Sequence, residues 1–189
     1  MNDEEKEYIK AIEKFRKEKD EFFKRHPQSP LTPEQKREFK GLKYYPPDPK
    51  YRFIVRLVKF DNPEIVHIIT NTPQVQEYYR YAYVEFEIDG KKCRLHVYKS
   101  PEDEYLFVPF LDATSGVETY ESGRYVELEH LEKDLYILDF NLAYNPYCAY
   151  NNNWVCPITP QENRLDCEIK AGEKIFKEKT RGFGLDLKI

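Results

Sequence analysis

The residue types best suited to chemistry are concentrated in one segment, LDFNLAYNPYCAYNNNWVCP, which runs from Leu138 to Pro157. It contains five asparagines, five aromatic residues and two cysteines but no lysine or arginine, in a chain that is 34% charged. Asparagine offers a hydrogen-bond donor and an acceptor, and tyrosine adds rigid apolar area with a polar tip. Such a set suits a site for a neutral or weakly charged polar molecule. It suits an ordered loop equally well, because asparagine tolerates left-handed backbone and hydrogen-bonds its own chain.

A second group of polar residues lies at the ends of predicted strands. Asp112 and Thr114 follow one strand, and Asp139 and Asn141 lie on the same side of another by period-two alternation. If neighbouring strand ends converge, one mouth is lined by Asp112, Arg124, Asp139, Asn141 and Asn145. Arg124 can grip a carboxylate through two hydrogen bonds. Two interpretations stay open: a buried pair of Arg124 with an aspartate that locks two loops, or Arg124 presented to an anionic group of a ligand.

Cys148 and Cys156 form a third feature, because the short loop between them can return on itself. A disulfide there would contribute on the order of 2–3 kcal/mol in the chain-entropy model. Cytosolic thiols usually stay reduced, so plain buried thiols are the alternative. A metal site would need Cys167 and a histidine as further ligands, and this spacing matches no standard zinc pattern. We predict a disulfide or close thiol pair and no metal site.

The composition restricts the class of protein. At 189 residues, with 40% hydrophobic and 15% aromatic residues, the chain suits one domain with an appendage. The net charge of −4 lacks the basic footprint of a nucleic-acid-binding protein. No apolar leader follows the acidic residues 1–5, and no stretch approaches the ~18 apolar residues of a membrane span. We therefore expect a cytoplasmic protein that binds neither nucleic acid nor membrane.

Two helices are predicted in an N-terminal arm. Within residues 1–25 an apolar stripe recurs at helical spacing, formed by Tyr8, Ile9, Ile12, Phe15, Phe22 and Phe23. This stripe either lies on the rest of the domain or joins two copies of the chain as a homodimer. A second helix over 33–40 is predicted from Thr32 and Gln35 as a capping box, with Gly41 as its stop. We assign residues 1–43 to the helical arm and connector, and 44–189 to a β domain.

From residue 51 the pattern changes to strands. YRFIVRLVKF and EIVHIIT are the first candidates, and Asp89-Gly90 predicts a tight hairpin within residues 80–99. Pairing across this turn places Phe86 opposite Cys93 on an apolar face and Glu85 opposite Arg94 on a charged one. Further strands are predicted at EYLFVPF, near Thr119, at RYVEL, at LYILDF and at RLDCEIKAG. Many short strands without interleaved helices predict a mainly β fold: an antiparallel sandwich or partly open β-barrel.

Three blocks of the sequence resemble the family called domain of unknown function 1684. They are LFVPFLDATSGVETYESGRY, LDFNLAYNPYCAY and CPITPQENRLDCEIKAGEK, and the resemblance covers roughly residues 30–175. The recurrent pattern of the family maps onto Pro109, Phe110, Asp112, Thr114, Gly116, Thr119, Tyr120, Gly123, Arg124, Tyr125, Asp139, Phe140, Asn141, Tyr144, Asn145, Pro146, Cys148, Tyr150, Cys156, Pro157, Glu162, Asn163, Gly172 and Glu173. Many relatives resemble exported or lipid-anchored proteins with a leader, and we expect none in this chain. The resemblance implies a shared architecture and site, and no reaction.

We predict a small-molecule binding module that takes a small polar molecule. Its ligand-binding residues are Asp112, Thr114, Arg124, Asn141, Tyr144, Asn145, Tyr150 and Asn163. One alternative is a hydrolase-like enzyme that uses Asp112 and Asp139 as acid and base. The other is a structural or interaction protein that acts through its N-terminal helix. None of the four histidines falls within the three family blocks, which disfavours a Ser-His or Cys-His hydrolase. The sequence identifies no cofactor.

Overall fold

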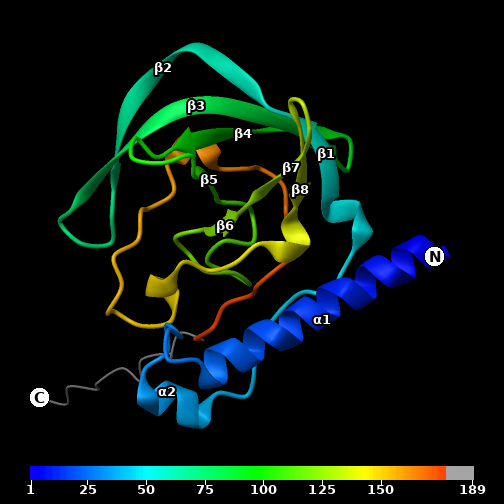
Figure 1. The fold of residues 1–189 in the computed structure, drawn as a ribbon, viewed down its shortest axis with the longest axis vertical. Coiled ribbons are helices and arrows are strands. Elements are labelled where there is room, and N and C mark those ends of the chain that lie inside the picture. The colour runs from blue at the N-terminus through cyan, green and yellow to red at the C-terminus, as the bar shows by residue number, and fades with distance from the viewer. Residues whose placement is uncertain (178–189) are drawn as a thin grey trace, which may run out of the picture.

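A computed structural model describes residues 1–177 (Figure 1). Two α-helices precede eight strands, and irregular chain with short 3₁₀ turns makes up most of the remaining described part. The elements are α1 (Asp3–Arg25), α2 (Pro33–Glu38), β1 (Arg52–Arg56), β2 (Val58–Ile69), β3 (Val75–Ile88), β4 (Lys91–Lys99), β5 (Leu106–Phe110), β6 (Arg124–Val126), β7 (Leu128–Glu132) and β8 (Leu135–Asp139).

The strands form two antiparallel sheets, which confirms the predicted mainly β fold. One sheet has the order β2-β3-β4-β5-β6 and the other the order β1-β8-β7. Among the described strands the sheets do not close into a barrel, because each sheet keeps two edge strands. A hydrophobic core cluster lies between them and contains Val55 and Leu138 from one sheet with Val84, Leu95 and Phe110 from the other.

The β3–β4 hairpin has the predicted register. Phe86 pairs with Cys93 and Glu85 with Arg94. Asp89 and Gly90 at the turn have φ angles of 49° and 77°, the left-handed values that a two-residue hairpin turn of this type requires. Local turn chemistry and alternation were sufficient to place the pairs from Ala82–Val97 to the turn, and the register shifts beyond them, between Arg80 and Ala82.

Four strand predictions were wrong in part. The segment RYVEL is divided between β6 and β7, which belong to different sheets. The segment 51–60 is divided between β1 and β2, which belong to different sheets, and Leu57 at the break donates its N–H to the carbonyl of Asp134 at 2.8 Å. Near Thr119 the structure has only an isolated bridge to Ser115. The segment RLDCEIKAG forms only an isolated bridge, between Arg164 and Leu111, and side chains of Arg124 and Asp112 take up the backbone groups of Ile169.

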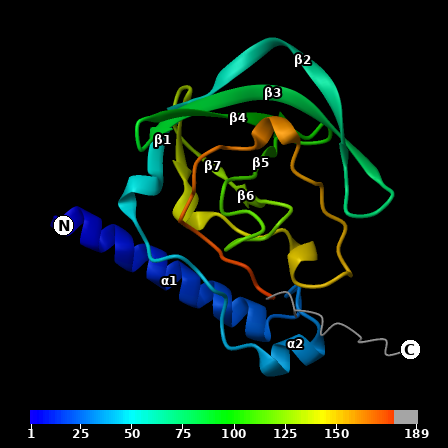
Figure 2. The ribbon, with the colours of Figure 1, turned by 180° about the vertical axis from the view of Figure 1, so that it is seen from behind.

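Helix α1 lies across one end of the sheets and covers the irregular segments there (Figures 1 and 2). It begins with a capping box between Asn2 and Glu5. Its inner face buries Ile12, Arg16 and Phe23 within the same chain. The apolar stripe therefore lies largely on the domain itself, and a homodimer through this helix stays a prediction. Neither helix of the described residues is long and apolar enough to cross a membrane.

Helix α2 has the predicted capping box, since Thr32 accepts from the N–H of Gln35 while the Gln35 side chain accepts from the N–H of Thr32. The helix ends at Glu38, before the predicted stop at Gly41.

Two glycines with positive φ provide a matched test of this packing. A Cβ at Gly123 (φ 95°) would lie 2.5 Å from the carbonyl oxygen of Phe110 and 2.7 Å from Oγ1 of Thr159, whereas a Cβ at Gly90 (φ 77°) meets nothing within 4 Å. We expect Gly90→Ala to lower the free energy of unfolding by roughly 1–2 kcal/mol through backbone strain alone. Gly123→Ala should lose a further roughly 1–3 kcal/mol through overpacking. Urea unfolding measures both, and equal losses would contradict the packing described.

Candidate functional site

Arg124 occupies the interior of the fold. It is 0% exposed, and its guanidinium donates to three backbone carbonyls: those of Ile169 (2.9 Å), Ala171 (2.5 Å) and Glu173 (3.1 Å). These carbonyls belong to alternate residues of the irregular segment 169–173, which bends at Gly172 (φ 76°). Arg124 therefore supplies the hydrogen-bond donors that a strand would otherwise supply to residues 169–173.

Asp112 completes this arrangement from the turn after β5. Its carboxylate lies 3.5 Å from the Arg124 guanidinium and accepts from the N–H of Ile169 at 2.6 Å and from the hydroxyl of Thr114 at 2.9 Å. Burial lowers the pKa of Arg124, and the charge of Asp112 opposes this effect. Of the two interpretations left open by the sequence, the contacts match the buried pair that locks two loops.

The side chains of Asn141 and Asn163 hydrogen-bond to the protein backbone rather than line a cavity. The side chain of Asn141 accepts from the N–H of Asp48 at 2.9 Å and donates to the carbonyl of Asp48 at 2.8 Å. Asn163 does the same to His96, at 2.9 Å in both directions. Each amide pairs with both backbone groups of one residue, as a neighbouring peptide would. Both asparagines are buried.

The hydrogen-bonding capacity of the Asp139 carboxylate is also taken up by the protein. Its carboxylate accepts from the Tyr8 hydroxyl at 2.7 Å and from the N–H of Asn141 at 2.9 Å, and it caps the turn that follows β8. The Tyr8 contact fixes the first turns of α1 on the domain.

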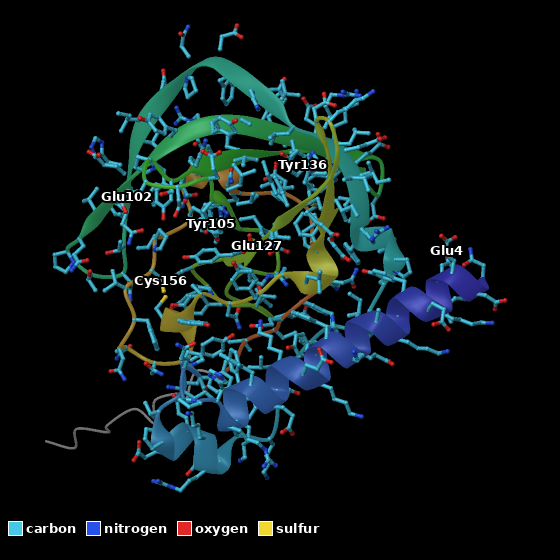
Figure 3. The ribbon with its side chains drawn as sticks, viewed as in Figure 1. Glu4, Glu102, Tyr105, Glu127, Tyr136 and Cys156 are labelled. Atoms are coloured by element: carbon cyan, nitrogen blue, oxygen red, sulfur yellow. The ribbon has the colours of Figure 1, made fainter. Side chains whose placement is uncertain are left out.

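A hollow does exist, next to the site that the sequence predicts. A cavity of about 570 Å³ lies between α1, the strand region around β5 and β6, and the loop 144–157. We call it the aromatic cavity. Its walls are formed by Phe15, Lys19, Phe23, Tyr105, Tyr125, Tyr144, Asn145, Pro146, Tyr147, Tyr150, Trp154, Val155, Cys156 and Pro157. Figure 3 shows Tyr105 above the loop that carries Cys156.

The hydroxyls of four wall tyrosines already have protein partners. Tyr125 donates to the carbonyl of Pro157 at 2.5 Å, Tyr150 donates to Glu173 at 2.7 Å, and both Tyr105 and Tyr144 donate to Glu127. Burial raises the pKa of Tyr105 to about 12, and burial also raises the pKa of the other three. These phenols remain neutral near pH 7, so the wall offers ring surface with no phenolate charge.

The charge in the cavity wall is balanced. Lys19 from α1 pairs with Glu173, a carboxylate that is 1% exposed and also accepts from the N–H of Asn145 at 2.9 Å. The ammonium group lies 5.6 Å from the ring centre of Phe23 and 5.2 Å from that of Tyr144. Glu173 thus connects α1 to the loop through a pair without net charge.

The predicted site residues divide into two groups. Tyr144, Asn145 and Tyr150 line the aromatic cavity. The others bind the protein's own backbone or side chains beside it and do not line that cavity: Asp112, Thr114, Arg124, Asn141 and Asn163. We expected one pocket lined by all of these residues. The structure instead has a buried hydrogen-bonded interior and a neighbouring cavity.

Several wall residues were not predicted as part of a site. Trp154 and Tyr147 belong to the uncharged segment, whose aromatic content was the available signal. Phe15 was assigned to the helical stripe without a link to the loop. The sequence carries no sign that Lys19 meets Glu173.

The four cysteines are free thiols in the structure. The backbone N–H of Cys148 donates to Sγ of Cys156 at 3.3 Å, so the two residues are neighbours, and their disulfide stays a prediction. Among the described residues no group of three or more histidine, cysteine or acidic side chains is placed to hold a metal ion.

A family model described as "Protein of unknown function (DUF1684)" matches residues 37–174. The chain belongs to this family. The match includes the buried Arg124–Asp112 unit and the loop of the aromatic cavity, but not α1, which closes the cavity from the other side. Membership in DUF1684 therefore accounts for the β domain and leaves the chemistry open.

A solved structure is similar along nearly the whole length. The solution NMR structure of an uncharacterised protein of Haloarcula marismortui is 38% identical, covers 92% of this chain and 97% of that chain, and superposes with a TM-score of 0.68. No curated protein matches the chain.

The contacts of Arg124 with Asp112 and with the carbonyls of residues 169–173 predict how a substitution of Arg124 changes stability. Arg124→Met removes the donors to three carbonyls and leaves the Asp112 charge buried without its partner, so we expect a loss of about 3–5 kcal/mol in the free energy of unfolding. The control is Arg94→Met, whose pair with Glu85 is about half exposed and should cost at most about 1 kcal/mol. Chemical denaturation measures both, and a loss at Arg124 no larger than at Arg94 would refute the structural role.

Proposed function

We propose that this protein binds a small molecule in the aromatic cavity. The observation that carries the proposal is a space of about 570 Å³ whose walls are mainly aromatic rings. Sites for drug-sized ligands measure roughly 300–1,000 Å³ and combine apolar walls with a few polar groups. An apolar space of this size on a protein surface would otherwise leave ring surface in contact with water at a cost.

The wall favours a ring-bearing, uncharged ligand. Ring faces attract other rings, and such pairs contribute roughly 0.5–1.5 kcal/mol beyond buried area. A charged ligand would be desolvated among neutral phenols, and the one lysine in the wall already has Glu173 as its partner. This refines the polar molecule expected from the sequence toward one with few polar groups.

Asn145 provides one place for a polar group. It is 1% exposed, its N–H and its side-chain NH₂ have partners, and its side-chain oxygen has none among the described residues. A buried acceptor without a partner carries a desolvation cost. A hydroxyl or N–H on a ligand at this part of the wall would satisfy it after a small shift of the side chain.

The carboxylate-dependent enzyme receives no comparable support. That hypothesis needs Asp112 or Asp139 in a cleft and available for proton transfer. Each is buried, each accepts at least three hydrogen bonds from the protein, and neither lines the aromatic cavity.

Ligand binding can be followed by the protein's own tryptophan fluorescence. Trp154 is the chain's one tryptophan and lies in the cavity wall, so its emission reports directly on an occupant. We expect some member of a library of uncharged ring-bearing compounds to change this emission and to raise the melting temperature, since a ligand that binds only the folded state stabilises it.

A matched pair of variants tests whether the ligand binds in the aromatic cavity. Phe15 is 44% exposed and lines the cavity, whereas Ile54 on β1 is 62% exposed and does not. Phe15→Arg should weaken binding at least about tenfold, or about 1.4 kcal/mol, and Ile54→Arg should leave the Kd unchanged. Equal affinity of both variants, or no response of Trp154 to any compound, would count against the proposal.

A further inference from the structure

The four cysteines lie in two neighbouring pairs with different surroundings. Sγ of Cys93 lies 3.7 Å from Sγ of Cys167, in a contact between β4 and the C-terminal segment. Cys148 and Cys156 form the second pair, in which the backbone N–H of Cys148 donates to Sγ of Cys156. Only the second pair reaches the aromatic cavity, through Cys156.

Cys156 is surrounded by hydrogen-bond donors. The N–H of Cys148 donates to its sulfur at 3.3 Å. The Cys148 thiol, and after it the backbone N–H groups of Cys148 and Tyr147, lower the pKa of Cys156 to about 7 against the opposing effect of burial, whereas the same thiol contact and burial raise the pKa of Cys148. The thiolate, not the thiol, is the nucleophilic form of cysteine. The two cysteines therefore differ: Cys156 is the nucleophile of the pair, and Cys148 keeps its proton.

The backbone around Cys156 is held in place. Asn71 accepts from the N–H of Cys156 at 2.8 Å, donates its own N–H to the carbonyl of Cys156 at 3.1 Å, and donates its side-chain NH₂ to the carbonyl of Trp154 at 2.9 Å. Cys156 is only 8% exposed, so an incoming molecule meets its sulfur from the cavity side rather than from an open surface.

The Cys93–Cys167 pair lacks these features. Burial and the adjacent Cys93 raise the pKa of Cys167 to about 12, and neither sulfur lines the aromatic cavity. It is a built-in control, because its sulfurs are also in contact but have no donors to a thiolate comparable with those at Cys156.

We propose that Cys156 is a peroxide-reactive thiol in the wall of the aromatic cavity and that Cys148 resolves its oxidised form as a disulfide. The oxidant is hydrogen peroxide or a small organic hydroperoxide. The inference goes beyond ligand binding and does not depend on it, since the peroxide is its own probe.

The two steps balance. The thiolate sulfur of Cys156 attacks the OH oxygen of the hydroperoxide, the O–O bond breaks, and the other oxygen leaves as hydroxide or alkoxide, which takes up the proton that the Cys156 thiol released to solvent and becomes water or an alcohol. Cys156 is then a sulfenic acid. The sulfur of Cys148 attacks the sulfenic sulfur, the S–O bond breaks, and the hydroxide takes the Cys148 proton and leaves as water. Two thiols lose two electrons and two protons to the hydroperoxide, and a dithiol reductant reverses the change by thiol–disulfide exchange.

The test uses the full reduced chain, treated with hydrogen peroxide and then blocked with N-ethylmaleimide for peptide mapping by mass spectrometry. We expect a Cys148–Cys156 cross-link to form at least about tenfold faster than any oxidation of Cys93 or Cys167, because thiolate character sets the rate. In Cys148→Ser, which keeps a side-chain hydrogen-bond donor at this position but cannot form the disulfide, dimedone should trap a sulfenic acid at Cys156. In Cys156→Ser, Cys148 should stay unmodified over the same time.

Three results would overturn the inference. They are oxidation of the Cys93–Cys167 pair first, dimedone trapped at Cys148 in the Cys156→Ser variant, or no modification of Cys156 in the folded wild type. Near-ultraviolet circular dichroism checks that each variant keeps its tertiary structure. If ligand titration fails while the cross-link forms, the proposed function fails and this inference stands. If a ligand binds while Cys156 stays unmodified, this inference fails and the proposed function stands.

Discussion

The structure depends on one buried charge pair that takes the place of a missing strand. Arg124 on β6 and Asp112 after β5 together hold both the carbonyls and an N–H of the segment 169–173. A lone charge at this depth would be strongly unfavourable, and its hydrogen bonds and its partner are what make it tolerable. Because the last residue of that segment is Glu173, the pair also determines where the next buried carboxylate lies.

From Glu173 the same constraint extends to the aromatic cavity. Its carboxylate accepts from Tyr150 and Asn145 and pairs with Lys19, so loop and helix are joined at one point. The T-shaped contact between Phe23 and Tyr150, with 5.2 Å between ring centres, packs the helix onto the loop around it. The cavity is therefore a consequence of how the interior is hydrogen-bonded, and its residues come from parts of the chain that are far apart in sequence.

The amide-rich segment now has a physical explanation. Asn141 and Asn163 use their side chains as substitute peptides, each bonding the N–H and the carbonyl of one extended residue. Irregular chain in an interior must satisfy its backbone groups somehow, and side-chain amides are suited to this because they carry both a donor and an acceptor. Lysine and arginine in their place would bring a net charge that the interior could not balance.

A structural feature could be predicted from the sequence when the residues that determine it lie close together along the chain. The β3–β4 register and the Thr32 capping box depend on residues within a few positions of one another, and both were predicted correctly. The segment RLDCEIKAG shows the limit: its first part pairs with the backbone of Leu111 and Ala113, but Ile169 has the side chains of Arg124 and Asp112 as partners, which no periodicity reveals. The Lys19–Glu173 pair spans 154 positions and likewise has no local signature.

Native-state hydrogen exchange of the Ile169 amide tests the central claim most directly. This N–H belongs to no strand, yet it donates to a carboxylate that is 1% exposed at the centre of the fold. If the Arg124–Asp112 pair replaces a strand, the Ile169 amide should exchange as slowly as the slowest amides of β3 and β4, because it opens only when the whole domain unfolds. Exchange at the rate of a surface loop amide would show that the segment opens on its own and that the pair does not hold it.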